Sequence, residues 1–283
     1  MGIKIVTDST CYIPKHIRKS KDINVVSLSV NFGSDSYQEE DMEYGDFYEK
    51  LSKSDELPTS SQPSLHCLVS CFEKIILAGH SVVGVFLSSL MSGTYSTAIM
   101  AKDMVLKDHP DAIIEIVDSK SNSMEMGFAV LAGAVAAKAE MSLKHVLESI
   151  NHVIDRSRFL FVPETLTYLK KGGRIGRASA LLGTVLQIKP ILTVTDGVTT
   201  VFDKVRTKKK AIQKIVDFFL DEVKEKGLGK VVVHHINCES EGKKLAKFIQ
   251  DRTNKEVPVY SIGPVVGLHV GPGTIGIAYY TEK

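Results

Sequence analysis

Short apolar runs that alternate with helix-like segments are the feature that most constrains this fold. Residues 82–87 form a continuous apolar run of strand length, as expected of a strand covered on both faces. Helical spacing follows over about 94–105, and a second apolar run occupies 113–117. Strands that alternate with helices indicate parallel βαβ crossovers. We therefore expect an α/β fold whose first half is a Rossmann-like parallel sheet layered with helices.

The other segments of the first half fit the same architecture. Residues 3–6 are a short apolar run that ends in Thr7-Asp8-Ser9-Thr10, which is typical of a strand that enters a loop. Residues 58–64 are polar and punctuated by proline, which predicts a loop. The remaining expected elements are a strand at 24–30 and helices at 44–51, 65–77, 128–138 and 143–154.

The second half has a different pattern. Asp196-Gly197 joins two β-rich runs, at 188–194 and 198–202, and a DG turn between such runs is a strong hairpin signal. The hairpin indicates a mixed α/β sheet. The remaining expected elements are helices at 208–226 and 239–252 and strands at 231–236, 257–262 and 275–280. The change of pattern near 155–158 predicts an N-terminal α/β domain over residues 1–157 and a C-terminal α/β domain over 158–283.

Composition excludes several classes of protein. The 283 residues are 43% hydrophobic and 24% charged, which is globular composition. The formal net charge of +2 gives no global field that would recruit nucleic acid or an anionic membrane. The longest apolar run, 126–137, falls short of the roughly 20 residues of a membrane span, and no secretory signal is visible. We expect a cytoplasmic protein without stable membrane insertion and without a nucleic-acid partner.

Cysteine and histidine spacing does not indicate a metal site. The four cysteines form no CxxC pair, and no histidine is spaced with them as in a zinc site. We expect reduced thiols that are buried or half-buried, and neither a metal ion nor a cofactor.

A hydroxyl-rich loop at 58–64 is the first candidate for chemistry. It places Thr59, Ser60, Ser61 and Gln62 between two prolines, with Ser64 directly after the second, and the prolines stiffen the loop. Stiff hydroxyl donors suit an anionic ligand. The alternative is structural, because Ser64 is well placed to cap the next helix, and the two interpretations are compatible.

The second candidate is the passage from a buried strand into a helix at Ser92-Gly93-Thr94. Ligands of open α/β sheets bind outside the carboxyl ends of the strands. Helix N-termini attract anions, and Gly93 would let a ligand approach the backbone closely. Capping by Ser92 or Thr94 is the alternative explanation.

Two glycine-rich segments and one basic segment complete the candidates. Residues 172–177 contain three glycines with Arg174, and could either hold a phosphate or end a helix whose last turn carries Lys170 and Lys171. Residues 262–273 predict an irregular, constrained loop around His269. Residues 204–210 carry five basic side chains, which form either a solvated face or a docking patch for an acidic partner.

Taken together, these segments resemble the DegV family of bacterial fatty-acid-binding proteins. The resemblance covers the whole chain, and the joint order and spacing of its short motifs are highly specific. The motifs are Ile5-Val6-Thr7-Asp8-Ser9, Ser61-Gln62-Pro63-Ser64, Ser92-Gly93-Thr94-Tyr95, Val117-Asp118-Ser119, Gly172-Gly173-Arg174-Ile175, Ile188-Lys189-Pro190-Ile191 and the glycine-rich segment from Gly263 to Gly273.

The resemblance implies two α/β domains with a long-chain fatty acid in a cleft between them. It also implies a partner, an ATP-dependent fatty acid kinase that phosphorylates the bound acid to an acyl phosphate. The family's carboxylate-binding Thr and Ser fall on Ser60 and Ser92, and Thr59 could compensate for the Thr-to-Ser change at position 60. The family's kinase-engaging Arg falls on Arg206. The histidine of the glycine-rich segment falls on His269, after a Leu268 that replaces a common Thr.

The main alternative is a stand-alone lipid hydrolase that uses Ser92 with His269. The sequence has no G-x-S-x-G nucleophile elbow, and no acidic residue flanks His269. A nucleotide-binding domain is disfavoured because phosphate-loop motifs are missing, and a DNA-binding regulator is disfavoured by the small net charge. We therefore expect a lipid-binding subunit that works with a separate kinase and is not an enzyme alone.

Overall fold

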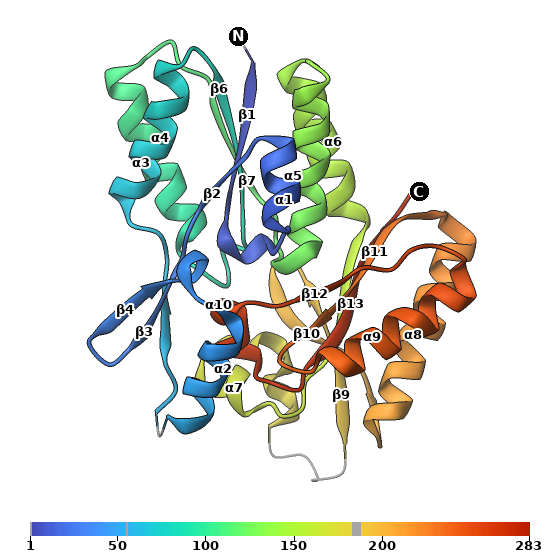
Figure 1. The fold of residues 1–283 in the computed structure, drawn as a ribbon. Helices are drawn as coiled ribbons and strands as arrows, with labels where there is room; N and C mark the ends of the chain where they lie inside the picture. The colour runs from blue at the N-terminus through green and yellow to red at the C-terminus, as the bar shows by residue number, and fades with distance from the viewer. Residues whose placement is uncertain (1, 55, 183–187) are drawn as a thin grey trace. The chain divides into compact units, whose positions relative to one another are not determined.

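The computed structural model describes residues 2–54, 56–182 and 188–283 as an α/β protein (Figure 1). By contacts between residues, the chain divides into two compact units. Unit 1 contains residues 1–31, 35–41 and 60–155, and unit 2 contains 32–34, 42–59 and 156–283. Sequence patterns gave no sign that 32–34 and 42–59 group with the second unit. The predicted division into domains 1–157 and 158–283 stays a prediction.

Unit 1 is built on a parallel four-stranded sheet. The strands lie in the order β2 (Ile23–Val26), β1 (Ile3–Asp8), β6 (Ser81–Phe86) and β7 (Ile114–Asp118). All neighbouring strands are parallel. Every residue of β6 is buried, which is the burial that its unbroken apolar run predicts. The expected Rossmann-like sheet is therefore confirmed.

Helices cover both faces of this sheet. Figure 1 shows α3 (Leu65–Leu77) and α4 (Thr94–Asp108) on one side, with α1 (Lys15–Lys21), α5 (Ser123–Lys138) and α6 (Leu143–Arg156) on the other. Alternate residues of β1 pack against the helices on the two faces of the sheet. Val6 belongs to a core cluster with Phe72 of α3 and Ala98 of α4. A Cβ added at Gly133 of α5 would touch both Ile150 of α6 and Ile5.

The expected single strand at 24–30 is wrong. The chain breaks there into β2 and β3 (Ser29–Phe32), and β3 joins a second sheet between β4 (Asp35–Gln38) and β5 (Thr59–Ser61). At the break, side-chain hydroxyls accept hydrogen bonds from backbone N–H groups. Leu28 N–H donates to Ser9 Oγ at 3.1 Å, and Ser27 Oγ accepts from Glu40 N–H at 3.2 Å. The segment 58–64, expected as a loop, contributes β5.

Short elements and one cysteine also differ from expectation. Short 3₁₀ turns were not expected, because segments of this length carry little periodicity. They are η1 (Ser9–Cys11), η2 (Glu39–Asp41) and η3 (Gly176–Leu181). Neither α1 nor β4 was expected. The four thiols are free, but Cys67 is exposed, whereas a buried or half-buried thiol was expected. Cys67 lies on α3 outside the face that packs on the core.

Unit 2 contains a mixed six-stranded sheet, in the order β10-β9-β8-β13-β11-β12. The strands are β8 (Ser157–Val162), β9 (Lys189–Thr195), β10 (Val198–Val205), β11 (Leu228–His235), β12 (Val259–Ser261) and β13 (Ile275–Thr281). β11 and β12 run parallel, whereas β9 is antiparallel to β10 and β13 is antiparallel to β8 and β11. Asp196 (φ 52°) and Gly197 (φ 80°) form the predicted hairpin turn.

The helices of unit 2 are α2 (Tyr44–Lys53), α7 (Thr167–Lys171), α8 (Lys208–Lys226), α9 (Glu239–Thr253) and α10 (Pro264–Val270). The apolar faces of α8 and α9 pack on the sheet in one core. Within it, the rings of Phe219 and Tyr279 meet edge to face with their centroids 4.8 Å apart. Within the described residues, no helix combines the length and apolarity that a bilayer span requires.

The expected irregular loop at 262–273 is wrong, because its centre is the helix α10. Pro264 stands at the first helical position, where its fixed φ suits a helix and its missing N–H costs nothing. Gly271, with φ at 92°, ends the helix. Glycine and proline mark the two ends of a short helix here, a pattern that also occurs in loops.

Candidate functional site

The carboxyl edge of the unit 1 sheet contains a topological switch point between β1 and β6. The chain passes from β1 to β2 on one side and later returns to β6 on the other side. Connections leave the sheet in opposite directions at such a point, and ligands of open α/β sheets bind outside the strand ends there. Asp8 ends β1 here, and the loop 87–93 connects β6 to α4.

Asp8 ties the two loops at the switch point together. Its side chain is fully buried, and one carboxylate oxygen accepts from Thr10 N–H at 2.9 Å and from Thr10 Oγ1–H at 2.5 Å. The other oxygen accepts from Leu87 N–H at 2.8 Å. Burial raises the pKa of Asp8 from 3.8 to about 6, although these hydrogen bonds oppose the shift.

Ser92, Gly93 and Thr94 form the N-terminus of α4. Ser92 Oγ and Thr94 Oγ1 lie 2.9 Å apart in a hydrogen bond, and Ser92 Oγ also accepts from Thr94 N–H at 3.3 Å. The N-cap residue of α4 is Gly93 and no side chain caps the helix, so the alternative explanation by a Ser92 or Thr94 cap does not hold. One hydroxyl proton is used between the two side chains, which leaves the pair one O–H for an anion. The helix N-terminus adds positive potential.

Gln62 joins the hydroxyl-rich segment to this helix. Gln62 Nε2 donates to Thr97 Oγ1 at 2.7 Å, and Thr97 Oγ1 donates to Gly93 O at 3.1 Å. A Cβ added at Gly93 would lie 2.1 Å from Gln62 Oε1, so only glycine permits this approach. Gln62 stands in the Ser61-Gln62-Pro63-Ser64 motif, but the sequence alone assigns it no role. Its signal was a lone amide in a proline-stiffened segment.

The hydroxyls of 59–61 differ in their surroundings. Thr59 and Ser61 are exposed and Ser60 is half-buried, in agreement with the alternation of side chains along β5. Ser61 Oγ accepts from Asn31 Nδ2–H at 2.7 Å, which occupies it structurally. Ser64 Oγ accepts from Cys67 N–H at 3.2 Å, and so the predicted cap of α3 is confirmed.

A buried polar turn after β7 supports the loop that carries Ser92. Ser88 N–H donates to Ser121 O at 2.8 Å, and Asn122 Nδ2–H donates to Met91 Sδ at 3.3 Å. Ser121 in turn is hydrogen-bonded to the buried Glu125. The loop 88–92 is therefore fixed from the sheet side as well as by Asp8.

In unit 2, His269 lies against the glycine turn that ends α7. A Cβ added at Gly172 would lie 2.3 Å from His269 Nδ1, and Arg174 Nη1–H donates to Gly172 O at 2.8 Å. Burial, together with the nearby Arg174 guanidinium, lowers the pKa of His269 to about 4. His269 is therefore neutral at pH 7. Lys170 and Lys171 are exposed in the last turn of α7, which confirms the predicted helix end.

Two tyrosines hold α10, and hence His269, in place. Tyr48 of α2 donates its hydroxyl to Ile262 O at 2.9 Å, and a Cβ at Gly267 would lie 2.1 Å from that hydroxyl oxygen. On the other side, a Cβ at Gly271 would lie 2.3 Å from the ring of Tyr168. Neither tyrosine was singled out from the sequence, because their partners lie far away along the chain.

Arg206 is exposed between β10 and α8. Thr207 caps α8 by accepting from Lys210 N–H at 3.2 Å, and Lys208, Lys209 and Lys210 follow in the first turn. Positive charges at a helix N-terminus oppose the helix dipole. Such a locally unfavourable placement is expected where a surface serves an interaction.

The predicted site residues therefore form two groups. Ser60, Ser92, Gly93 and Thr94 belong to unit 1, whereas Thr59, Arg174, Arg206 and His269 belong to unit 2. Across the described ranges 2–54, 56–182 and 188–283, no cluster of three or more His, Cys, Asp or Glu side chains could hold a metal ion. The hydroxyls of unit 1 offer neutral donors at a helix N-terminus, which suits a carboxylate.

We expect Asp8→Asn to change how stability depends on pH. Folded Asp8 holds its proton up to about pH 6, whereas an unfolded Asp releases it near 3.8. The folded state therefore binds more protons between these values, and stability falls as the pH rises through them. Urea unfolding at pH 4 and pH 7 should show a difference between wild type and variant that shifts by roughly 2–3 kcal/mol. A difference that stays constant with pH would contradict the account.

We expect Gly93→Ala to be costly only while Gln62 is present. The φ of Gly93 is −75°, which alanine adopts freely, so the cost comes from the clash with the Gln62 side chain. The loss in unfolding free energy should be about 1–3 kcal/mol in the wild type and smaller by at least ~1 kcal/mol in a Gln62→Ala background. Additive losses in urea unfolding would show that Gln62 does not pack on Gly93.

Known proteins resemble this chain over its full length. The family model described as the uncharacterised DegV family matches residues 2–282. A DegV domain-containing protein of Clostridium acetobutylicum is 49% identical over 283 residues, covering 100% of this chain and 99% of the relative. The solved structure of a stearic acid-binding protein from Eubacterium ventriosum has a TM-score of 0.90 at 26% identity, covering 99% and 98% of the two chains. That of DegV, a fatty acid binding protein from Bacillus subtilis, has a TM-score of 0.89 at 33% identity and covers 99% of both. The chain belongs to the DegV family.

Proposed function

We propose that this protein binds a long-chain fatty acid and presents its carboxylate to a fatty acid kinase, which phosphorylates it to an acyl phosphate. The observation that carries the proposal is the Ser92–Thr94 hydroxyl pair at the N-terminus of α4, beside the β1/β6 switch point. The structurally similar proteins from Eubacterium ventriosum and Bacillus subtilis are described as fatty-acid-binding. A cytoplasmic location, where ATP is available, belongs to the same proposal.

The acyl tail supplies most of the binding energy in this proposal. Burial of one methylene contributes about 0.8 kcal/mol, so ~15 methylenes give a gross gain near ~12 kcal/mol before the costs of association. The head group then needs only to be oriented and hydrogen-bonded, because an unpaired buried carboxylate is expensive. The division into domains over 1–157 and 158–283 is part of the same proposal.

Neutral donors suit a carboxylate that must react. Ser92, Thr94 and Ser60 can hydrogen-bond a carboxylate without neutralising it as a bidentate arginine would. The carboxylate then keeps its nucleophilicity for attack on the γ-phosphate that the kinase supplies. Phosphoryl transfer depends mainly on positioning and charge stabilisation, and that machinery belongs to the partner. In this view the chain is a binding subunit and not an enzyme.

His269 and Arg174 are proposed to complete the head-group environment from unit 2. His269 is neutral at pH 7, so it can donate or accept a hydrogen bond without adding charge. Arg174 is exposed next to it and can meet the negative charge that develops when a phosphoryl group arrives. Thr59 is the alternative to Ser60 as a hydrogen-bond donor to the carboxylate.

The kinase is proposed to dock at the basic segment around Arg206. Arg206, Lys204, Lys209 and Lys210 are exposed. On a protein whose net charge is only +2, such a cluster favours an acidic partner surface and speeds encounter with it. Nucleic acid is disfavoured as a partner because few aromatic side chains accompany the cluster.

Ser92→Ala should weaken fatty acid binding. Loss of a hydrogen bond to a charged group costs about 1.5–3 kcal/mol, which corresponds to a rise in Kd of roughly tenfold or more. Titration of delipidated protein with a fluorescent long-chain fatty acid measures this. Ser96→Ala, an exposed hydroxyl one turn further along α4, is the matched control and should bind like wild type. Equal affinities for both variants would count against the role of Ser92.

Arg206→Ala should lower phosphorylation of the bound acid without lowering its affinity. The side chain belongs to unit 2 and is proposed to contact only the kinase. We expect at least a fivefold rise in the KM for the loaded protein as kinase substrate, with an unchanged fatty acid Kd. Lys224→Ala, which removes an exposed positive charge at the other end of α8, should leave both values unchanged. A parallel loss of fatty acid affinity in Arg206→Ala would overturn the assignment.

The stand-alone hydrolase is the second candidate, and the local chemistry disfavours it. Ser92 Oγ is hydrogen-bonded to Thr94 Oγ1, and His269 lies beside a guanidinium instead of a carboxylate. A histidine with a pKa near 4 is a weak general base at neutral pH. Incubation with long-chain acyl esters in the absence of a kinase discriminates, because turnover would favour the hydrolase.

A further inference from the structure

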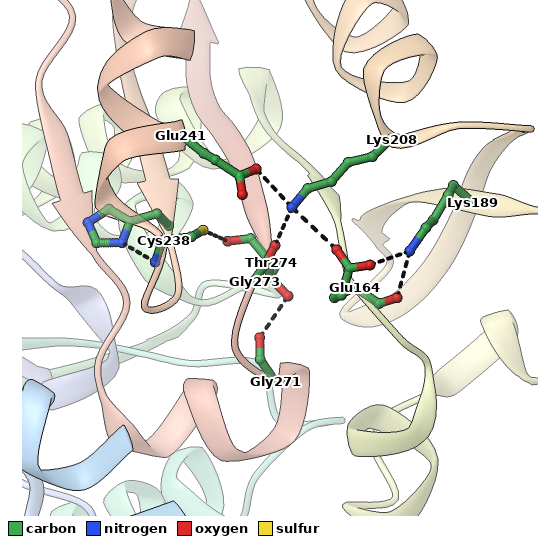
Figure 2. Close-up of polar contacts among 9 residues, drawn as sticks. Glu164, Lys189, Lys208, Cys238, Glu241, Gly271, Gly273 and Thr274 are labelled. Carbon is green, nitrogen blue, oxygen red and sulfur yellow. Dashed lines mark hydrogen bonds and ion pairs between the residues drawn. The ribbon is translucent and has the colours of Figure 1, made fainter. Parts of the chain in front are cut away.

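Lys208, the first residue of α8, has a more complete set of partners than the basic residues around it. Its Nζ lies 2.9 Å from Glu241 Oε2, 2.9 Å from Gly273 O and 3.3 Å from Glu164 Oε2 (Figure 2). An ammonium group has three N–H donors, so these three acceptors use all of them. Lys208 is half-buried, whereas Lys209 and Lys210 are exposed. Lys208 is therefore not available to a partner in the way its neighbours are.

The partners of Lys208 form a balanced ionic cluster. Glu164 Oε1 pairs with Lys189 Nζ at 2.6 Å, and the same ammonium donates to Glu164 O at 2.9 Å. The hydrogen bond from Lys189 lowers the pKa of Glu164. Burial alone would lower the pKa of Lys208, but its bonds to Glu241 and Glu164 raise it. Both shifts favour the charged forms of Glu164 and Lys208. Networks of several charges hold their geometry better than isolated ion pairs.

The cluster joins segments that lie far apart in the sequence. Glu164 follows β8, Glu241 lies in the first turn of α9, and Gly273 lies in the turn that follows α10. Figure 2 shows Lys208 reaching between the two carboxylates to the backbone of that turn. Lys208 is two residues from Arg206, and Gly273 is four residues from His269.

The turn that receives Lys208 is well ordered by its own contacts. Gly273 N–H donates to Ile236 O at 2.8 Å, and Thr274 Oγ1–H donates to Gly271 O at 2.8 Å. Cys238 Sγ–H donates to Thr274 O at 3.3 Å. Lys208 therefore connects an ordered turn to the start of α8.

We propose that Lys208 is a positioning residue that holds the Arg206 segment to the turn following His269. The role of Arg206 rests on the proposed function, whereas the mechanical link rests on the ionic cluster alone. Docking of a partner at the basic segment then acts on the same rigid body that carries His269, since one ammonium group connects both. Lys208 itself contacts neither the fatty acid nor the kinase.

Hydrogen exchange of the whole protein tests the link without a kinase. Lys208→Met keeps the apolar stem and removes the charge, and it should speed amide exchange at least fivefold in both 204–210 and 271–274. Lys243→Met is the matched control, because it breaks an exposed ion pair with Glu239 on the neighbouring helix. Glu241→Gln weakens the same cluster more mildly and covers the case in which Lys208→Met folds poorly. Exchange that changes in only one segment, or in neither, overturns the link.

Kinase assays at saturating fatty acid test the consequence. Lys208→Met should raise the KM for the loaded protein at least threefold at an unchanged fatty acid Kd, and Lys208→Arg should restore part of the loss. Because Lys208 acts through Arg206, the double variant with Arg206→Ala should match Arg206→Ala alone within about twofold. Failure of wild type to be phosphorylated would refute the proposed function. Phosphorylated wild type with Lys208→Met equal to Lys243→Met would refute the positioning role.

Discussion

The hydrogen bond from Leu87 N–H to the buried Asp8 carboxylate is the contact on which the unit 1 site depends. It fixes the loop after β6 relative to the end of β1, at the topological switch point of the sheet. The start of α4, with Ser92 and Thr94, follows from the position of that loop. Burial of a carboxylate is unfavourable, which its raised pKa reflects. The structure keeps it because three hydrogen bonds at one place order two loops.

The chemistry of the two units is complementary in kind. Unit 1 offers hydroxyl groups and a helix N-terminus, which can hydrogen-bond a carboxylate without neutralising it. Unit 2 offers a histidine that burial keeps neutral, an adjacent guanidinium, and a basic segment whose exposed charges oppose the dipole of α8. The unit 2 histidine lies beside a guanidinium instead of a carboxylate, which is an unfavourable setting for a general base. These groups fit the proposed role of a protein that holds an acid for another protein to modify.

The sequence predicted those parts of the fold that depend on local pattern. The unbroken run that became β6 and the Asp196-Gly197 hairpin were recognisable because burial on both faces and turn geometry leave local signatures. The break between β2 and β3 was not recognisable, because the hydroxyls of Ser9 and Ser27 that stabilise it act across long separations. The helix α10 was mistaken for a loop, since glycine and proline mark both. The grouping of 42–59 with unit 2 depends on contacts such as that of Tyr48 with Ile262.

The same distinction between local and long-range signals applies to the candidate site. Ser92, Gly93 and Thr94 could be found because a strand end, a glycine and hydroxyls coincide in sequence. Gln62, Tyr48 and Tyr168 could not, because each acts by filling the space above a distant glycine.

Native mass spectrometry of the protein purified from its host without delipidation tests the central claim most directly. The account predicts a species heavier by the mass of one long-chain fatty acid, released by organic extraction. A homogeneous apo mass that stays unchanged after incubation with long-chain fatty acids would contradict it.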